Sequence, residues 1–250
     1  MIFAAGLGTR LQTVTQTMPK ALVQIDGLPL LEHCLRNLQS QGVTQVVINV
    51  HHFADQIEAY VHKRKSTGLE ILISDERALL LETGGGVRKA ADLLLHGFAR
   101  SHPQAPILLH NVDIFSNLNL AALMQFHLHS SADATLAASV RDSKRYLYFD
   151  TAGRLQGWQN QITGEQKPTA FDASKLQAMA FSGIHILSAN MLSELQAWPE
   201  RFSIIDFYLS NLKDHTYQLY AQAGMRVLDV GKPESIDLAA QFIHNHPPLL

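Results

Sequence analysis

The sequence has little of what marks several classes of protein. It contains a single cysteine, Cys34, so an internal disulfide framework is excluded. No apolar run reaches the ~18 residues that are needed to span a bilayer. Residues 1–6 have neither the basic region nor the long apolar segment of a secretion signal. We therefore expect a soluble, cytoplasmic protein that has no membrane partner.

An excess of charge of one sign is also missing. The 250 residues include 20 Lys and Arg and 22 Asp and Glu, which gives a formal net charge of −2. This balance provides no global basic field, so nucleic acid is not expected as a partner. An anionic small molecule would have to be held by a few placed cations, backbone amides and a metal ion.

Glycine and proline are sparse, with 15 and 9 residues, while hydrophobic residues make up 46% of the chain. This composition excludes a disordered or collagen-like chain and supplies a sizeable core. The length suits one large domain or two small ones. Because no linker, repeat or low-complexity tract interrupts the sequence, we expect a single domain over residues 1–250.

Short apolar runs alternate with helical patterns in the first half of the chain. Leu31, Cys34 and Leu38, for example, lie on one helical face, which makes Cys34 an expected core residue. The alternation predicts an α/β fold, a Rossmann-like and mostly parallel sheet with helices on both faces. The expected strands are 2–5, 45–50, 70–74 and 106–111, and the expected helices are 29–41, 54–63 and 86–95.

The pattern changes at Thr135 to short strands that are separated by turn residues. Residues 135–180 are expected to form a small antiparallel β insertion that serves as a lid or an acceptor pocket. Further strands are expected at 181–187, 217–222 and 226–230, and further helices at 189–195, 204–213 and 233–245. Only three residues precede Ala4, so either the first strand is short or the natural chain starts upstream of Met1.

Ligands of parallel sheets bind beyond the carboxyl ends of the strands. Two glycine-rich stretches, 6–10 and 83–86, follow expected strands and are predicted to be loops there. Backbone amides of such a turn can surround an anion. Arg10 adds a fork of donors and Lys20 a mobile charge that suit phosphate oxygens. The Gly-x-Gly element alone is more typical of an ordinary turn with exposed basic residues.

Two aspartates, Asp113 and Asp229, each follow an apolar run and are expected at the same edge of the sheet. Mg²⁺ takes few carboxylates in proteins and completes its shell with waters and phosphate oxygens. Two Asp residues from distant strands meet that need. An aspartate that merely caps a turn at a strand end is an equally good reading of either residue.

The complete motifs change this balance. Residues 4–11 read A-A-G-L-G-T-R-L, and residues 19–22 read P-K-A-L. Together with L-E-T-G-G-G at 81–86, N-V-D at 111–113, F-S-G-I at 181–184 and D-V-G at 229–231, they closely resemble the sugar-1-phosphate nucleotidyltransferase family in order and spacing. The resemblance implies the nucleotide-diphospho-sugar transferase fold. It also implies a reaction in which a sugar 1-phosphate attacks the α-phosphorus of a nucleoside triphosphate and yields a nucleotide-sugar and pyrophosphate.

The resemblance also implies roles for individual residues. Arg10 and Lys20 would be the catalytic cations, which hold the triphosphate and contact the phosphates at the reacting centre. Asp113 and Asp229 would hold Mg²⁺, the expected cofactor. The nucleotide would be bound by the backbone around Ala4, Ala5, Gly6, Leu7, Gly8 and Thr9 and by Thr83, Gly84 and Gly85.

The sugar would be bound by a second group of residues, in part less closely matched to the family. The family's E-K-P segment reads Glu165-Gln166-Lys167-Pro168 here, and Val112 stands where the family commonly has a smaller residue. Trp158 stacks on the sugar or packs in the insertion, and packing is favoured. Asp206 reaches the site or lies on a helix surface. The expected sugar-binding residues are Asn111, Trp158, Glu165, Lys167, Ser182 and Gly183.

Within this family, the triple glycine and the compact length look most like N-acetylmuramate-1-phosphate uridylyltransferases. Mannose-1-phosphate guanylyltransferases are the closest alternative, and thymidylyl- and cytidylyltransferases are also compatible. A non-catalytic nucleotide-sugar-binding regulatory protein is a second class, and a glycosyltransferase a third. Retention of Arg10, Lys20, Asp113 and Asp229 together favours the enzyme. Too few residues follow Asn245 for the β-helix domain of bifunctional acetyltransferase relatives.

Overall fold

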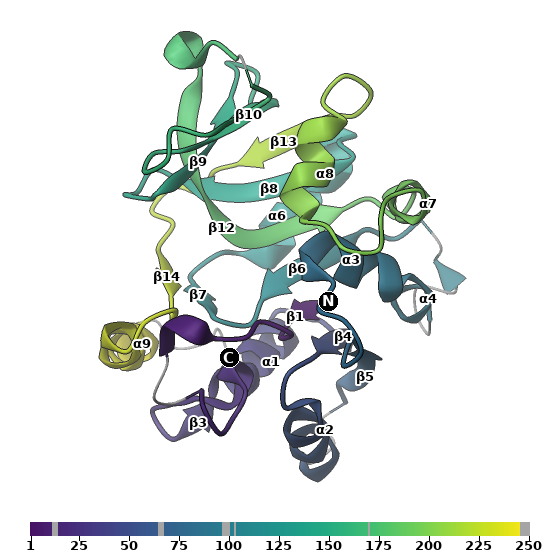
Figure 1. Ribbon diagram of the computed structural model, residues 1–250, viewed down its shortest axis with the longest axis vertical. Coiled ribbons are helices and arrows are strands. Elements are labelled where there is room, and N and C mark those ends of the chain that lie inside the picture. The colour runs from purple at the N-terminus through teal and green to yellow at the C-terminus, as the bar shows by residue number, and fades with distance from the viewer. Residues whose placement is uncertain (12–14, 65–67, 97–100, 103, 170, 246–250) are drawn as a thin grey trace.

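The computed structural model describes residues 1–11, 15–64, 68–96, 101–102, 104–169 and 171–245 (Figure 1). Its central sheet has the strand order β5-β4-β1-β6-β12-β8-β13. Every neighbouring pair is parallel except the two that β12 makes with β6 and β8. The strands are β1 (Ile2–Phe3), β4 (Gln45–Val50), β5 (Glu70–Asp75), β6 (Ile107–Asn111), β8 (Ala134–Ser139), β12 (Gln177–Leu187) and β13 (Tyr217–Tyr220).

Successive residues of a strand point to opposite sides of a sheet. Apolar side chains of this sheet point to both sides, and helices cover both of its faces. On one face Val47 and Leu109 pack against α3, α4, α7 and α8, and on the other Val46 and Ile48 pack against α1, α2 and α6. The predicted α/β class is therefore confirmed. The helices are α1 (Leu30–Ser40), α2 (Ala54–Lys63), α3 (Glu82–Lys89), α4 (Ala91–Leu94), α6 (Leu120–Ser130), α7 (Met191–Gln196), α8 (Ile204–Ser210) and α9 (Glu234–Asn245).

A small antiparallel sheet extends the central sheet at one end. It contains β9 (Arg145–Phe149), β10 (Leu155–Asn160) and β11 (Gln166–Lys167), and β12 joins the two sheets because its first half pairs with β9. Figure 1 shows this sheet rising above the body of the molecule. The strand β8, which we expected in the insertion, instead pairs with β12 and β13 in the central sheet. Its residues 134–138 are buried, as in a strand that is covered on both faces.

A two-stranded ribbon brings a late part of the chain back to the strand ends. The strands β7 (Ile114–Ser116) and β14 (Val227–Asp229) are antiparallel, with Asp229 opposite Ile114. Behind the ribbon, α9 packs on a small core that includes Leu11, Val230 and Ala239. The described residues also form β2 (Gln24–Ile25), β3 (Leu28–Pro29) and the 3-10 helices Thr9–Leu11, Lys20–Leu22 and Ala173–Lys175.

Within the described residues, no helix combines the length and the apolar character needed to cross a membrane. The first strand is shorter than the predicted 2–5. It ends at Phe3 because the amide of Ala4 donates to the Asn49 side chain at 2.8 Å instead of to a neighbouring strand.

Candidate active site

A cleft of about 640 Å³ lies beyond the carboxyl ends of β1 and β6. Parallel sheets bind their ligands at this edge. The loop 3–10 and Lys20 form one side of the cleft, and the segment 111–113 forms its floor. Glu82 and Thr83, at the start of α3, line it as well. The structure thus places the N-terminal motif, Lys20 and the N-V-D segment around one space.

The conformation of the N-terminal loop depends on Gly8. This residue has a φ of +64°, and a Cβ atom there would lie 3.0 Å from Cγ2 of Thr15 and 3.1 Å from Cβ of Lys20. Glycine therefore lets the loop fold closely over Lys20. At Gly6, by contrast, a Cβ atom would meet no atom within 4 Å. The backbone at Gly6 consequently offers open space for an approaching ligand.

Two cation–carboxylate pairs converge at the end of this loop. The ammonium of Lys20, whose side chain is only 10% exposed, donates a hydrogen bond to Oδ2 of Asp113. Nη2 of Arg10 lies 3.7 Å from Oδ2 of Asp229. The amide of Val230 donates to the carbonyl of Asp113 at 2.9 Å, which fixes the two carboxylate-bearing segments side by side. The four charged residues singled out from the sequence are thus neighbours.

The electrostatics of Asp229 reflect this crowding. Burial raises the pKa of its carboxyl, and the negative charge of Asp113 raises it further, while Lys20, Arg10 and Arg141 act in the opposite direction. Burial and a like charge both disfavour the ionised form. A divalent cation that binds between the two carboxylates would remove this repulsion.

The donor set around Asp113 and Asp229 suits Mg²⁺. Both donors are carboxylates, and Mg²⁺ binds one or two of these together with waters and substrate phosphates. Among the residues that the structure describes, no group of three or more His, Cys, Asp or Glu forms an all-protein metal cage. The residues present therefore fit a magnesium ion that arrives with a triphosphate.

The glycine of the D-V-G motif keeps space for Arg10. A Cβ atom on Gly231 would lie 2.7 Å from Nη2 of Arg10 and 2.8 Å from Oδ1 of Asp229. These distances are shorter than van der Waals contact, so a larger residue would displace one of the two side chains. The motif thus serves the approach of Arg10 to Asp229.

The triple glycine does not form the predicted loop. Residues 83–86 lie in α3, and the amides of Gly84 and Gly85 donate to the carbonyl of Phe202 at 2.9 Å and 3.2 Å. A Cβ atom on Gly84 would lie 2.3 Å from the Phe202 ring, and one on Gly85 would lie 2.2 Å from the carbonyl oxygen of Glu200. Both glycines are therefore required by packing behind the cleft. Thr83 is the predicted residue of this segment that reaches the cleft.

A buried network, which no sequence motif indicated, joins the N-terminal loop to the start of α3. Asn49 accepts from the amide of Ala4 and donates to Oε1 of Glu76, each at 2.8 Å. The other oxygen of Glu76 accepts from the amide of Leu81 at 3.3 Å. Burial raises the pKa of Glu76, against the hydrogen bond from Asn49. The one available signal was a polar Asn within the apolar run 46–50.

A second cavity of about 530 Å³ lies next to the cleft, under the small antiparallel sheet. Trp158, Glu165, Lys167 and Asp206 all line it. Nζ of Lys167 lies 2.8 Å from Oδ1 of Asp206, 3.5 Å from Oε1 of Glu165 and 5.5 Å from the centroid of the Trp158 ring. The hydrogen bond that Lys167 donates to Asp206 raises the pKa of Lys167. These candidates for sugar binding are therefore brought together, although Trp158 also packs on the core.

The F-S-G-I segment contributes less to this cavity than expected. The hydroxyl of Ser182 is buried and donates to the carbonyl of Ala137 at 2.6 Å, so it faces the core. Gly183 has a φ of +77°, and a Cβ atom there would lie 2.6 Å from Nδ2 of Asn111. The segment supports Asn111 in the cleft from behind, and Phe181 is the residue of this segment that lines the second cavity.

Sequence reasoning missed two arginines that precede or begin β9. Arg141 donates to the carbonyl of Phe181 at 2.8 Å, and its charge acts on Asp229. Arg145 lines both the cleft and the second cavity. No motif marks either residue, because the turn that carries them has no distinctive pattern.

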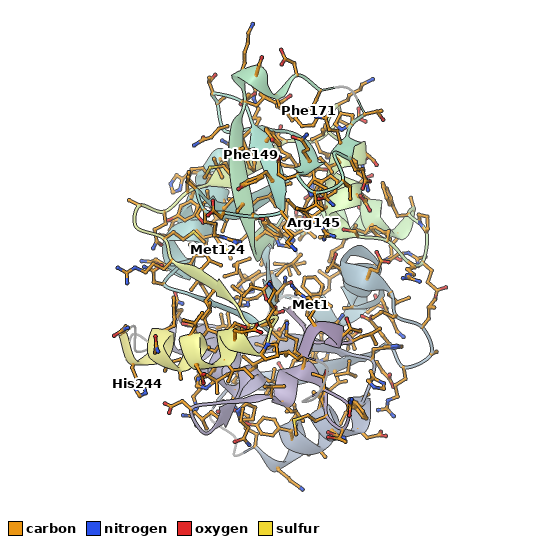
Figure 2. The ribbon with its side chains drawn as sticks, turned by 60° about the vertical axis from the view of Figure 1, so that its left-hand side comes forward. Met1, Met124, Arg145, Phe149, Phe171 and His244 are labelled. Atoms are coloured by element: carbon orange, nitrogen blue, oxygen red, sulfur yellow. The ribbon has the colours of Figure 1, made fainter. Side chains whose placement is uncertain are left out.

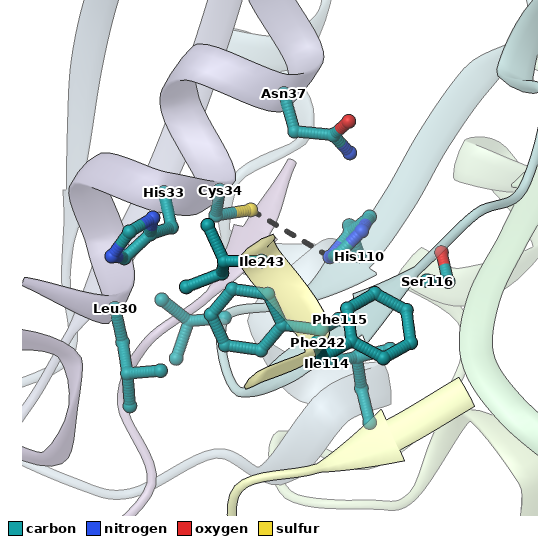
Figure 3. A pocket seen from close by; sticks show the side chains of 11 residues that line it. Leu30, His33, Cys34, Asn37, His110, Ile114, Phe115, Ser116, Phe242 and Ile243 are labelled. Atoms are coloured by element: carbon teal, nitrogen blue, oxygen red, sulfur yellow. Dashed lines mark hydrogen bonds between the residues drawn. The ribbon is translucent and has the colours of Figure 1, made fainter. Parts of the chain in front are cut away.

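A third and much smaller cavity, of about 60 Å³, lies behind Val112 (Figure 3). Sγ of Cys34 lies 3.7 Å from Nδ1 of His110 at its wall. Burial raises the pKa of Cys34 to about 12 and lowers that of His110 to about 4, so both are neutral at pH 7. The prediction that Cys34 is a core residue is confirmed, since it is 5% exposed.

The architecture and the cleft define an α/β nucleotide-diphospho-sugar transferase fold. UDP-glucose pyrophosphorylase from Acinetobacter baumanii shares this fold with a TM-score of 0.75 at 17% identity, over 99% of this chain and 94% of that one. Residues 1–246 match the model of the nucleotidyl transferase family, and the chain belongs to that family.

Curated relatives define the kind of transferase further. The chain is 40% identical to N-acetylmuramate alpha-1-phosphate uridylyltransferase from Caulobacter vibrioides, over 96% of this chain and 94% of that protein. It is 26% identical to mannose-1-phosphate guanyltransferase beta-B from Xenopus laevis, over 100% of this chain and 67% of that protein. The protein is a sugar-1-phosphate nucleotidyltransferase, as the sequence motifs predicted.

Proposed function

We propose that this enzyme transfers UMP from UTP to N-acetylmuramate 1-phosphate, with Mg²⁺ as its cofactor, and releases pyrophosphate. The observation that carries the proposal is the 40% identity to a uridylyltransferase of this specificity over nearly the full length of both chains. The match to the guanyltransferase is 26%, so transfer of GMP to mannose 1-phosphate is the alternative.

The chemistry requires alignment and charge neutralisation rather than a protein nucleophile. An oxygen of the sugar phosphate forms a bond to the α-phosphorus, and the bond from the α-phosphorus to the bridging oxygen breaks. The electron pair of that bond leaves with pyrophosphate. Arg10, on the glycine loop, suits binding of the triphosphate and of the charge that grows on pyrophosphate. Lys20, which lines the cleft and pairs with Asp113, suits contact with the phosphates at the reacting centre.

Asp113 and Asp229 would hold Mg²⁺ in the cleft. A bound magnesium ion supplies Lewis-acid polarisation of phosphate oxygens and a template for both reacting groups. The two aspartates would hold that ion together, because Asp113 lies two residues after the end of β6 and Asp229, the last residue of β14, lies opposite the adjacent Ile114. The neighbouring cavity, with Trp158, Glu165 and Lys167, is where we place the sugar.

A substrate screen tests the proposed specificity. UTP, GTP, CTP and dTTP are each combined with N-acetylmuramate 1-phosphate, N-acetylglucosamine 1-phosphate and mannose 1-phosphate, and pyrophosphate release is measured. We expect UTP with N-acetylmuramate 1-phosphate to give the highest kcat/KM, by at least about 10-fold. A preference for GTP with mannose 1-phosphate would replace the proposal by its alternative. Binding of nucleotide without any pyrophosphate release would point to a regulatory protein.

The metal assignment has its own test. Asp113→Asn and Asp229→Asn should each raise the Mg²⁺ concentration for half-maximal rate by at least about 10-fold, because each removes one of only two charged donors. Asp237→Asn, an exposed change on α9, is the matched control and should leave that concentration unaltered. An unchanged magnesium dependence in both site variants would contradict the assignment.

A further inference from the structure

Arg145 lies at the boundary between the two halves of the site. It is the first residue of β9, and it lines both the cleft, where we place the nucleotide, and the second cavity, where we place the sugar. Figure 2 shows it between the small antiparallel sheet and the body of the molecule. The boundary is where a phosphate group must lie if a sugar in one cavity attacks a nucleotide in the other.

The guanidinium of Arg145 is also available to bind a ligand. Across the described part of the chain, it forms neither an ion pair nor a hydrogen bond, and the contacts of this residue with Ser143 involve only its backbone. The other cations around the two cavities are already engaged by oxygen atoms. Lys20 pairs with Asp113 and Lys167 with Asp206 and Glu165, Arg10 lies 3.7 Å from Asp229, and Nη2 of Arg141 donates to the carbonyl of Phe181.

This distribution bears on Lys167, which the family resemblance places among the sugar-binding residues and which is another cation that a sugar phosphate could contact in the second cavity. Two carboxylates share its ammonium, and the nearer one raises its pKa, so its charge is largely compensated within the protein. A phosphate would have to compete with both carboxylates for it. Lys167 is better suited to orient Asp206 and Glu165 toward the hydroxyl groups of a sugar.

The reaction needs a free cation at the boundary. The attacking group is a phosphate, and it approaches a triphosphate of the same sign, so their repulsion opposes the alignment that in-line transfer requires. A guanidinium can bind two phosphate oxygens at once and leave the third free to attack. We propose that Arg145 binds the phosphate of the sugar 1-phosphate in this way and holds it facing the α-phosphorus. The inference rests on the proposed transfer reaction but not on which sugar is used.

Kinetics of Arg145→Gln, Arg145→Lys and a control variant test the proposal. Lys144→Gln removes an exposed cation from the adjacent position, which lines neither cavity. We expect Arg145→Gln to lower kcat/KM for the sugar 1-phosphate by about 100-fold, the usual scale for loss of one partner of a charge pair. The KM for UTP should stay within about twofold. Arg145→Lys should recover part of the loss, and Lys144→Gln should match the wild type.

A comparison of two sugar 1-phosphates provides a second test of the proposal. If Arg145 binds the phosphate, Arg145→Gln should lower kcat/KM by the same factor for N-acetylmuramate 1-phosphate and for N-acetylglucosamine 1-phosphate, which lacks the lactyl carboxylate. A loss confined to the first substrate would mean that Arg145 binds the carboxylate, and it would overturn the proposal. A raised KM for UTP with an unchanged response to sugar 1-phosphate would overturn it as well.

Direct binding separates this inference from the proposed function. Calorimetric titration with N-acetylmuramate 1-phosphate should show at least about 10-fold weaker binding to Arg145→Gln than to the wild type. Equal affinities would refute the role of Arg145 even if the enzyme is active. Absence of pyrophosphate release from the wild type with every substrate pair would refute the proposed function while leaving the binding comparison valid. The melting temperatures of the variants establish that each is folded.

Discussion

Replacement of Gly231 by alanine should impair the reaction while leaving the fold almost as stable as before. The added Cβ atom would lie 2.7 Å from Nη2 of Arg10 and 2.8 Å from Oδ1 of Asp229. The backbone at this glycine does not have a positive φ, so alanine can adopt its conformation. The contact must therefore be relieved by movement of the two side chains.

The expected magnitudes for stability and activity differ widely. Arg10 and Asp229 are 61% and 44% exposed and 3.7 Å apart, and an ion pair of this kind contributes less than about 1 kcal/mol to stability. The guanidinium of Arg10 is at the end of a flexible side chain, and it can move away from Gly231 at little cost in free energy. A displacement of about 1 Å at a reacting centre, however, can lower the rate about 100-fold. We expect a loss of about 10- to 100-fold in kcat/KM with a nearly unchanged melting temperature.

A double-mutant cycle shows whether the effect passes through Arg10. Arg10→Ala alone should lower kcat by about 100- to 1000-fold, as loss of one charge-stabilising donor does. If Gly231→Ala acts by displacing Arg10, adding it to Arg10→Ala should cause no further loss. Pyrophosphate release and thermal unfolding are measured for all four proteins. Two losses that multiply in the double variant, or a fully active Gly231→Ala, would refute the reasoning.

Two further predictions concern the core. Gly84→Ala should lower the free energy of unfolding by about 1–3 kcal/mol, because its Cβ atom would lie 2.3 Å from the Phe202 ring. Denaturant titrations should show that Phe202→Leu in the same chain restores part of the loss. Stabilisation by Gly84→Ala would contradict the expected clash with the Phe202 ring. Burial lowers the pKa of His185 from 6.5 to about 3. Below pH 6.5 the unfolded chain therefore binds a proton at this residue that the folded chain does not. As the pH falls, His185 should lower the free energy of unfolding by up to about 1.4 kcal/mol per pH unit. His185→Leu removes two buried nitrogens that have no hydrogen-bond partner among the described residues, and it should weaken the pH dependence of unfolding between pH 7 and 5. Parallel profiles of the variant and the wild type would contradict this account.

Local sequence patterns predicted the elements whose ends are set by local residues. The strand Gln45–Val50 and the helix Ala54–Lys63 have the predicted bounds. The strand is a short, nearly continuous apolar run and the helix has an apolar periodicity, so neighbouring residues suffice to define them. Predictions failed where contacts with residues that are distant in the sequence determine the local structure. The triple glycine is helical because Phe202 and Glu200 pack against it, and no window of sequence around residues 83–86 contains that information.

The residues of the candidate site likewise fall into those that local sequence motifs predicted and those that they did not. The charged members of motifs, such as Arg10 and Asp113, could be identified because their chemistry fixes the residue type and the spacing. Asn49 and Glu76 escaped attention, since their importance comes from hydrogen bonds between segments that are distant in the chain. Arg145 has no motif at all, and its interest arises from its position between two cavities.

The two carboxylates at the centre of the site are held together by the backbone and by apolar packing rather than by their own charges. Burial and the charge of Asp113 both raise the pKa of Asp229, so their electrostatic interaction opposes the arrangement. The β7–β14 ribbon, the hydrogen bond from the amide of Val230 to Asp113 and the core around Leu11 nevertheless keep them adjacent. Since none of these contacts depends on a carboxylate, neutral replacements at Asp113 or Asp229 should preserve the geometry. Loss of activity in such variants can then be attributed to the missing charge and not to a disrupted fold.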